Sequence, residues 1–168
     1  GRGSERFEYH TQLPGLSLTR AEPLLREPQL PEIVAAVRPC SLVELGAGSA
    51  TKTRLIIDEM RSSGCAECYV PIDVSKDFLE ATAVQLATDY PDIQITPVVS
   101  DITEPFALPA LVGSTLMAFL GRTVGTFQRE PAIRLISQVA GEMGTADRFL
   151  LGADLTQDTG VVNAPDNE

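Results

Sequence analysis

The stretch that decides the fold is Leu42-Val-Glu-Leu-Gly-Ala-Gly-Ser-Ala-Thr-Lys-Thr-Arg54. A short apolar run leads through Gly46 and Gly48 into a polar, helix-compatible segment, which predicts a strand, a tight turn and a helix. In a doubly wound α/β sheet this turn lies at the carboxyl end of a central strand, where the backbone approaches a nucleotide and a Cβ would interfere. We therefore expect a nucleotide site here, although similar turns also join strands to helices in proteins that bind no ligand.

The turn matches neither of two better-known phosphate-binding motifs. A dinucleotide fingerprint has a third glycine three positions after the second, where this chain has Thr51. A P-loop has glycine directly before its Lys-Ser/Thr pair, and here Thr51 precedes Lys52. The turn is therefore expected to hold a nucleoside, such as that of S-adenosylmethionine. Because the helix dipole disfavours a cation in the first turn, we expect Lys52 to point at a carboxylate, such as that of the ligand's amino-acid tail.

Composition restricts the class of partner. The chain has 168 residues, enough for one domain, and 43% of them are hydrophobic, enough for a sizeable core. Its formal net charge of −10 opposes attraction to phosphate backbones, so we expect a small molecule or a protein as partner and no nucleic acid. Because no run approaches the ~20 apolar residues of a membrane span, and no basic segment precedes an apolar one, we expect no membrane partner and a cytoplasmic location.

The cysteines and the histidine give no catalytic set. The three cysteines, Cys40, Cys65 and Cys68, cannot all pair within one chain, which predicts a reducing compartment. Cys65 and Cys68 form a Cys-x-x-Cys, but it precedes a predicted strand, whereas the redox version opens a helix, and no second pair completes a zinc site. We therefore expect neither redox nor metal chemistry. The single histidine, His10, is interpreted as a surface residue.

Strands and helices alternate along the chain, which predicts right-handed βαβ units and a doubly wound, mostly parallel α/β sheet of the Rossmann-like type. A lead-in over residues 1–19, extended or in short helical pieces, and a helix start at Thr19 to Glu22 come first. The predicted strands are 42–45, 69–73, 93–99, 116–120 and 149–151, and the predicted helices are 32–37, 50–60, from Ser75 to about 90, and from about 126 to 143 with Ile133, Ile136, Val139 and Met143 on one face. The expected domains are a cover segment with short helices (1–40), a cofactor-binding α/β domain (41–155) and a polar tail (156–168).

The predicted strands end in glycine or aspartate. Gly46 to Gly48 end the first strand, Asp73 follows the glycines by about 25 residues, and Asp101 and Gly121 end the third and fourth strands. Asp73 has the spacing of the acidic residue that accepts both ribose hydroxyls, since a carboxylate has two oxygens for a vicinal diol. Asp101 is a candidate acceptor for the adenine amine, or else a turn residue. This pattern by itself leaves a methyl donor and a nicotinamide cofactor both open, with Thr51 disfavouring the latter.

Four segments carry a resemblance to a known family: Glu44-Leu-Gly-Ala-Gly-Ser-Ala-Thr-Lys-Thr-Arg-Leu55, Tyr69-Val-Pro-Ile-Asp-Val-Ser75, Ala118-Phe-Leu-Gly-Arg-Thr-Val-Gly125 and Leu150-Leu-Gly-Ala-Asp-Leu155. Together they resemble the histidine-specific, S-adenosylmethionine-dependent methyltransferases. The best-known members trimethylate the α-amino group of histidine in ergothioneine biosynthesis, and a fungal branch methylates a tryptophan derivative. The lead-in, including Gly3-Ser-Glu-Arg-Phe7 and Leu13-Pro14, is similar to the family's cover over the active site.

The resemblance implies a role for individual positions. Gly46, Ala47 and Gly48 would form the cofactor turn, with Gly46 and Lys52 at the methionine portion. Asp73 would hold the ribose, and Asp101 with Ile102 the adenine. The implied substrate contacts are Phe7, Gly121 and Thr126. No side chain is expected to act as a nucleophile.

Three departures from the family pattern accompany the resemblance. Leu16 stands where the family has a cofactor-contacting tyrosine, and Thr126 replaces the asparagine that holds the substrate's amino and carboxylate groups. The family's second, substrate-recognising domain is expected after about residue 160, so the chain is expected to be truncated after its fifth strand. These departures support an alternative hypothesis, a cofactor-binding pseudo-methyltransferase or interaction module without turnover. They also predict an uncovered sheet edge through which two copies could form a homodimer.

Overall fold

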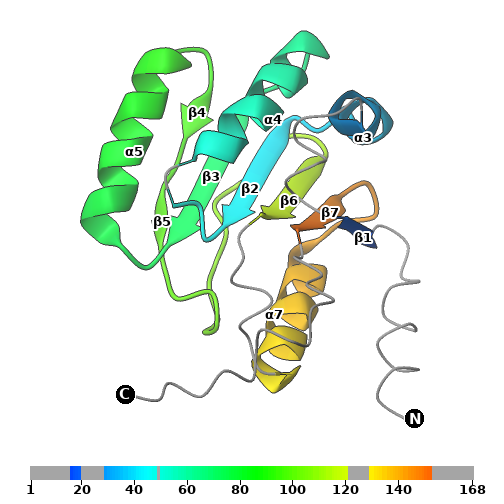
Figure 1. The fold of residues 1–168 in the computed structure, drawn as a ribbon, viewed down its shortest axis with the longest axis vertical. Coiled ribbons are helices and arrows are strands. Elements are labelled where there is room, and N and C mark those ends of the chain that lie inside the picture. Colours follow the sequence, from blue (N-terminus) through cyan, green and yellow to red (C-terminus); the bar gives the residue numbers. More distant parts are fainter. Residues whose placement is uncertain (1–15, 20–28, 49, 121–128, 153–168) are drawn as a thin grey trace, which may run out of the picture.

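The computed structural model of the chain describes residues 16–19, 29–48, 50–120 and 129–152. A single parallel sheet runs through them (Figure 1). Its strands are β1 (Leu16–Thr19), β2 (Ser41–Leu45), β3 (Cys68–Asp73), β4 (Gln94–Ile95), β5 (Val98–Val99), β6 (Thr115–Phe119) and β7 (Arg148–Gly152). The helices are α3 (Gln29–Val37), α4 (Thr51–Ser62), α5 (Lys76–Asp89) and α7 (Arg129–Glu142).

The strand order is β1-β7-β6-β2-β3-β4, with β5 also paired to β3. Every pair is parallel. From β2 the chain builds outward through β3 to β4 and β5, then returns to the other side of β2 as β6 and continues to β7. The order therefore reverses between β2 and β6, which is where open α/β sheets bind their ligands. This topology confirms the predicted doubly wound α/β fold.

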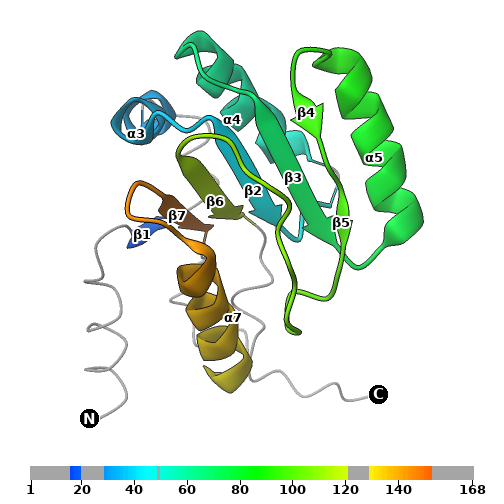
Figure 2. The same ribbon diagram turned by 180° about the vertical axis from the view of Figure 1, so that it is seen from behind.

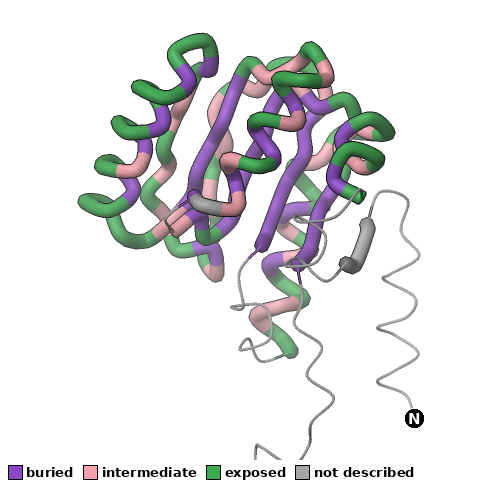
Figure 3. The backbone as a smooth tube through the Cα atoms, turned by 45° about the horizontal axis from the view of Figure 1, so that its top comes forward, coloured by how far each residue is buried: buried purple, intermediate pink, exposed green. Residues whose placement is uncertain are grey.

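Helices cover one face of the sheet, and a helix with a long loop covers the other. Leu42 and Tyr69 face α3, α4 and α5 and pack in one buried cluster with Ile56 and Leu86. Val43 and neighbouring strand residues face α7 and residues 102–111 and form a second cluster. Figures 1 and 2, turned by 180°, show α4 on one side of the sheet and α7 on the other. Both faces are covered, which explains why β2, β3 and β6 are almost entirely buried (Figure 3).

Local predictions hold in the central strands, fail at two places and leave the pairing of residues 16–19 unpredicted. The predicted third strand, 93–99, is broken into β4 and β5 around Thr96 and Pro97, because proline lacks the amide that a continuous ladder needs. The predicted helical face of α7 is wrong in part: Ile133 is 45% exposed, whereas Leu135 is buried with Val139. Residues 16–19, predicted as part of an extended or short-helical lead-in, form β1, which pairs with β7. The helix start predicted from Thr19 to Glu22 continues into residues outside the described part of the chain.

The pairing of β1 with β7 changes which strand is at the edge of the sheet. β7 was expected to be the last strand, yet Leu16–Thr19 lies outside it, with Leu18 opposite Leu151. On the other side, the outer strands β4 and β5 have two residues each. Short edge strands give a second chain little to pair with. The homodimer through a sheet edge stays a prediction.

Two of the three cysteines are paired, although their odd number in the sequence favours a reducing compartment. Cys40 and Cys65 are joined in a disulfide, with their Cα atoms 4.8 Å apart, and Cys68 is a buried free thiol. Sequence spacing gave no indication of this pair. None of the described helices is long and apolar enough to cross a membrane.

Asp147 gives a direct test of how β6 and β7 are joined. Its two carboxylate oxygens accept hydrogen bonds from the Thr115 amide (2.7 Å) and the Gly144 amide (2.7 Å). Asp147→Ala should therefore lower the free energy of unfolding by about 1–3 kcal/mol, because two amides lose their partner. Urea unfolding measures this change. Glu142→Ala, which removes an exposed carboxylate at the end of α7, should change it by less than about 0.5 kcal/mol; equal effects would contradict the prediction.

Candidate functional site

The glycine turn is fastened to the end of β3. The amides of Gly46 and Ala47 both donate to the carbonyl oxygen of Ile72, at 2.8 and 3.1 Å. Gly46 and Gly48 have φ angles of +67° and +50°, in the left-handed region that glycine adopts without a steric penalty. The turn predicted from the sequence is therefore held at the carboxyl ends of two neighbouring strands.

Asp73, the last residue of β3, contacts the turn directly. Its Oδ2 accepts a hydrogen bond from the Gly48 amide at 3.1 Å, and its Oδ1 accepts one from the Ser75 amide at 3.0 Å. Ser75 occupies the predicted N-cap of α5, although its side chain makes no capping bond. A carboxylate has about four lone-pair positions, so each oxygen of Asp73 retains capacity for another donor. The structure thus brings the glycines and Asp73 together.

The glycine turn is packed on one side and open on the other. A Cβ on Gly46 would stand 3.6 Å from Cε2 of Phe119, at the end of β6, whereas a Cβ on Gly48 would meet nothing within 4 Å. The turn therefore packs against the sheet at its first glycine and faces open space at its second. Ala50, the N-cap of α4, has no side-chain oxygen to offer the helix's first amides. These amides and the positive end of the helix dipole favour a negatively charged or hydrogen-bond-accepting ligand group.

Asp101 lies near Asp73 but takes part in a turn. The Ser100 amide donates to the Asp73 carbonyl oxygen at 3.0 Å, which places Asp101 after the neighbouring strand end. Its Oδ1 accepts from the amide (2.8 Å) and the hydroxyl (2.7 Å) of Thr103. Hydrogen bonds from Thr103 hold the pKa of this exposed carboxyl below its usual value. This geometry fits the turn role that the sequence left open; Ile102 beside it is buried in the core.

Several predicted site residues lie outside the described part of the chain. These are the three implied substrate contacts, Phe7, Gly121 and Thr126. His10, interpreted as a surface residue, lies outside it as well. The carboxyl end of β6, which leads to Gly121, adjoins the glycine turn through Phe119.

A buried carboxyl group beneath the turn has partners that the sequence did not predict. Glu44, one residue before the end of β2, is 4% exposed, and its Oε2 accepts hydrogen bonds from the hydroxyl of Tyr69 (2.7 Å) and from Thr53 in α4. Burial raises the pKa of Glu44 to about 7, although both hydrogen bonds and the charge of Lys52 favour ionisation. The sequence contained one sign of this buried group, because Glu44 is a charged residue in a short, largely apolar strand. Its partners depend on the alignment of β2, β3 and α4.

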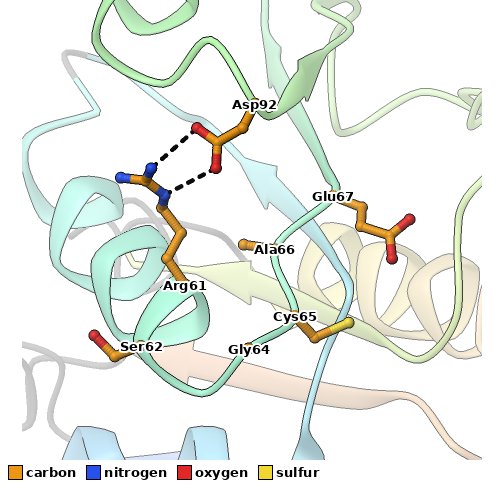
Figure 4. Close-up of a pocket in the computed structure, with 7 residues that line it drawn as sticks. All are labelled: Arg61, Ser62, Gly64, Cys65, Ala66, Glu67 and Asp92. Atoms are coloured by element: carbon orange, nitrogen blue, oxygen red, sulfur yellow. Dashed lines mark hydrogen bonds and ion pairs between the residues drawn. The ribbon is translucent and has the colours of Figure 1, made fainter.

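A cavity lies away from this site. It has a volume of about 530 Å³ and is lined by residues around the end of α4 and the start of β3, including Arg61, Cys65, Glu67 and Asp92 (Figure 4). Because β3 begins here and ends at Asp73, the cavity lies at the amino edge of the sheet, opposite the glycine turn. We therefore do not assign it to the nucleoside.

Known proteins resemble the chain in sequence. A family model described as histidine-specific methyltransferase, SAM-dependent, matches residues 1–167. The chain is 36% identical over 158 residues to a histidine N-alpha-methyltransferase of Mycolicibacterium smegmatis, an alignment that covers 94% of this chain and 49% of that protein. It is 25% identical over 162 residues to ergothioneine biosynthesis protein 1 of Neurospora crassa, covering 94% and 18%. The chain thus spans about half the length of the bacterial relative.

A solved structure resembles the chain in fold. The glycopeptide N-methyltransferase MtfA, complexed with (S)-adenosyl-L-homocysteine, matches with a TM-score of 0.53 and 16% sequence identity, over 89% of this chain and 58% of that one. At this level of identity the match concerns the fold, and it agrees with the strand order described above.

The raised pKa of Glu44 predicts that the free energy of unfolding depends on pH. Because its pKa is about 7 in the folded chain and 4.5 in the unfolded chain, the folded state binds more protons between these values. Its contribution to stability is therefore full below pH 4.5 and is lost as the pH rises through 7. Relative to Glu44→Gln, the wild-type free energy of unfolding should fall by up to ~3 kcal/mol over this range.

Urea unfolding of both proteins from pH 4 to pH 8 measures this difference. The glutamine keeps an oxygen that accepts from Thr53 and Tyr69, so the comparison isolates the proton. As a control, Glu67→Gln, which alters an exposed carboxylate, should follow the wild-type curve. Parallel curves for wild type and Glu44→Gln would show that Glu44 does not titrate in this range.

Proposed function

Because the chain belongs to the family of histidine-specific, S-adenosylmethionine-dependent methyltransferases, we propose that it methylates the α-amino group of histidine or of a related amino acid or amine. The relative named histidine N-alpha-methyltransferase supports this class of substrate. Since that relative is about twice as long as the matched region, the activity is proposed here for the whole protein to which this stretch corresponds.

One observation carries the proposal: the hydrogen bond between the Gly48 amide and Asp73, which joins the carboxyl ends of β2 and β3 next to the β2–β6 point where the strand order reverses. It places a carboxylate with remaining acceptor capacity beside a turn whose second glycine faces open space. We propose that Asp73 accepts the two ribose hydroxyls and that Gly46, Ala47 and Gly48 line the cofactor. The remaining proposed contacts are Lys52 for the amino-acid tail and Asp101 with Ile102 for the adenine.

The proposed reaction requires the protein to position the substrate amine and does not require a reactive side chain. S-adenosylmethionine supplies both the electrophilic methyl carbon and the leaving sulfide. The protein then has to hold a neutral amine in line with the carbon–sulfur bond, roughly 3 to 3.5 Å from the methyl carbon, and to exclude water. Phe7, Gly121 and Thr126 are the proposed contacts for that amine. No nucleophilic residue is assigned.

The proposal also includes the class of substrate and the location of the protein in the cell. The substrate is a small molecule, and the formal net charge of −10 supports the absence of a nucleic-acid substrate. A cytoplasmic location is proposed because amino acids and S-adenosylmethionine are metabolites of that compartment. The alternative, a module that binds the cofactor without turnover, is supported by Leu16 and Thr126 at positions where the family has other residues.

Calorimetry with S-adenosylhomocysteine tests the ribose contact. Asp73→Asn should weaken binding roughly 10- to 100-fold, because a charge-assisted pair of hydrogen bonds to the diol is lost. The 2′,3′-dideoxy analogue should bind wild type and Asp73→Asn almost equally, because it has no diol to recognise. If the substitution weakened both ligands alike, Asp73 would act only by holding the turn.

Two further measurements complete this test. Asp92→Asn, at the opposite edge of the sheet, should leave both affinities unchanged. Mass spectrometry after incubation with S-adenosylmethionine and histidine, or a panel of related amines, should show products heavier by the mass of one CH2 for each methyl group that replaces a hydrogen. Tight cofactor binding with no methylated product from the whole protein would favour the module without turnover.

A further inference from the structure

Cys40 and Cys65 lie side by side at the amino edge of the sheet, opposite the glycine turn. Cys40 precedes β2, Cys65 lies in the connection from α4 to β3, and their Cα atoms are 4.8 Å apart. Backbone hydrogen bonds hold the two segments together independently of the sulfurs: the amides of Glu67 and Cys68 donate to the Cys40 carbonyl oxygen at 2.9 and 3.2 Å. The two sulfur atoms therefore stay close when the bond between them is broken.

The bond encloses the unit that carries the candidate cofactor site. Residues 41–64 between the two cysteines comprise β2, the glycine turn and α4 (Figure 1). Closing a loop restricts the unfolded chain, and the effect grows with the length of the loop. The covalent state of Cys40 and Cys65 therefore bears on the stability of the strand, turn and helix at the candidate cofactor site.

Both cysteines are half-buried, but of the two only Cys65 is among the residues that line the cavity described above. It lines the cavity of about 530 Å³ at this edge, between Arg61 and Glu67 (Figure 4). Arg61 is engaged with Asp92 through two hydrogen bonds of 3.1 and 3.0 Å. Cys40 packs against the backbone of Gly113, where a Cβ would stand only 2.9 Å from the Cys40 sulfur. These positions distinguish an entry sulfur, Cys65, from a second sulfur behind it.

We propose that Cys40 and Cys65 form a thiol–disulfide exchange site for low-molecular-weight disulfides such as glutathione disulfide. The Cys65 thiolate attacks one sulfur of the reagent, forming a mixed disulfide and releasing one thiol. The Cys40 thiolate then attacks the Cys65 sulfur and releases the second thiol. Two protein thiols are oxidised to one disulfide while one small disulfide is reduced to two thiols, and a small thiol in excess reverses the reaction.

Cys68 provides a matched control within the same chain. It lies three residues after Cys65 but is 3% exposed and belongs to the core cluster on the α7 face of the sheet. Burial raises the pKa of its thiol, which disfavours the reactive thiolate. Cys68 should therefore stay reduced under conditions that oxidise the other two.

The experiment follows the fully reduced protein during incubation with glutathione disulfide. A chelator is present throughout, because Cys40, Cys65 and Glu67 bring two sulfurs and a carboxylate oxygen within 4.8 Å and could hold a metal ion. Peptide mass spectrometry without reduction should find residues 40 and 65 cross-linked, with Cys68 free. Cys40→Ser should instead retain one glutathione on Cys65, because the second sulfur is missing.

Thermal unfolding gives a second readout. The oxidised wild type should melt about 5 to 10 °C above the reduced protein. Cys68→Ala should keep this difference, and the Cys40→Ser/Cys65→Ser double variant should lose it. A cross-link that includes Cys68, glutathione retained on wild type without a cross-link, or equal melting temperatures for oxidised and reduced wild type would each overturn the proposal. None of these readouts depends on methyl transfer.

Discussion

Two amides, those of Gly46 and Ala47, donate to one carbonyl oxygen at the end of β3, and the arrangement of the candidate site depends on this junction. It requires a backbone that turns through the left-handed region directly after β2, which Gly46 provides with a φ of +67°. Once the turn is fixed, the Gly48 amide reaches Asp73 and α4 begins beside the same strand ends. The turn is thus held mainly by backbone hydrogen bonds, to which the Asp73 carboxylate adds a side-chain acceptor.

Beneath this junction the core carries an acidic group. Glu44 is surrounded by the apolar cluster on the α4 face and is reached by hydroxyls from a helix and from a neighbouring strand. Desolvation raises its pKa, and the hydrogen bonds limit the effect. Since Thr53 follows Lys52 in the first turn of α4, the same contact fixes the start of that helix relative to β2. The polar group therefore couples the helix to the sheet next to the turn.

Features that are local or repeated along the chain could be predicted from the sequence. Features that depend on pairing across the sheet could not. The strand, turn and helix from Leu42 to Arg54 were predicted because the apolar run, the glycines and the helical segment are contiguous. β1 was missed because four residues, Leu16–Thr19, acquire their strand character from β7, more than 120 residues away. Likewise, Cys40 and Cys65 meet only because Ser41 and Cys68 are opposite each other in the β2–β3 register. In α7, Leu135 rather than Ile133 is buried because the sheet decides which side of the helix faces inward.

The parallel register of β2 also limits how the chain can change in length. Successive residues of a strand point to opposite faces, so inserting one residue before Glu44 would move its carboxyl from the α4 face to the α7 face, away from Tyr69 and Thr53. The same insertion would separate the glycines from the Ile72 carbonyl. By contrast, the connection over residues 103–114 has neither strand nor helix and lies outside the sheet ladder. Length variation among natural homologues is therefore expected to spare residues 41–48 and to be easier in this connection, except where Phe106, Leu108 and Leu111 pack against the core.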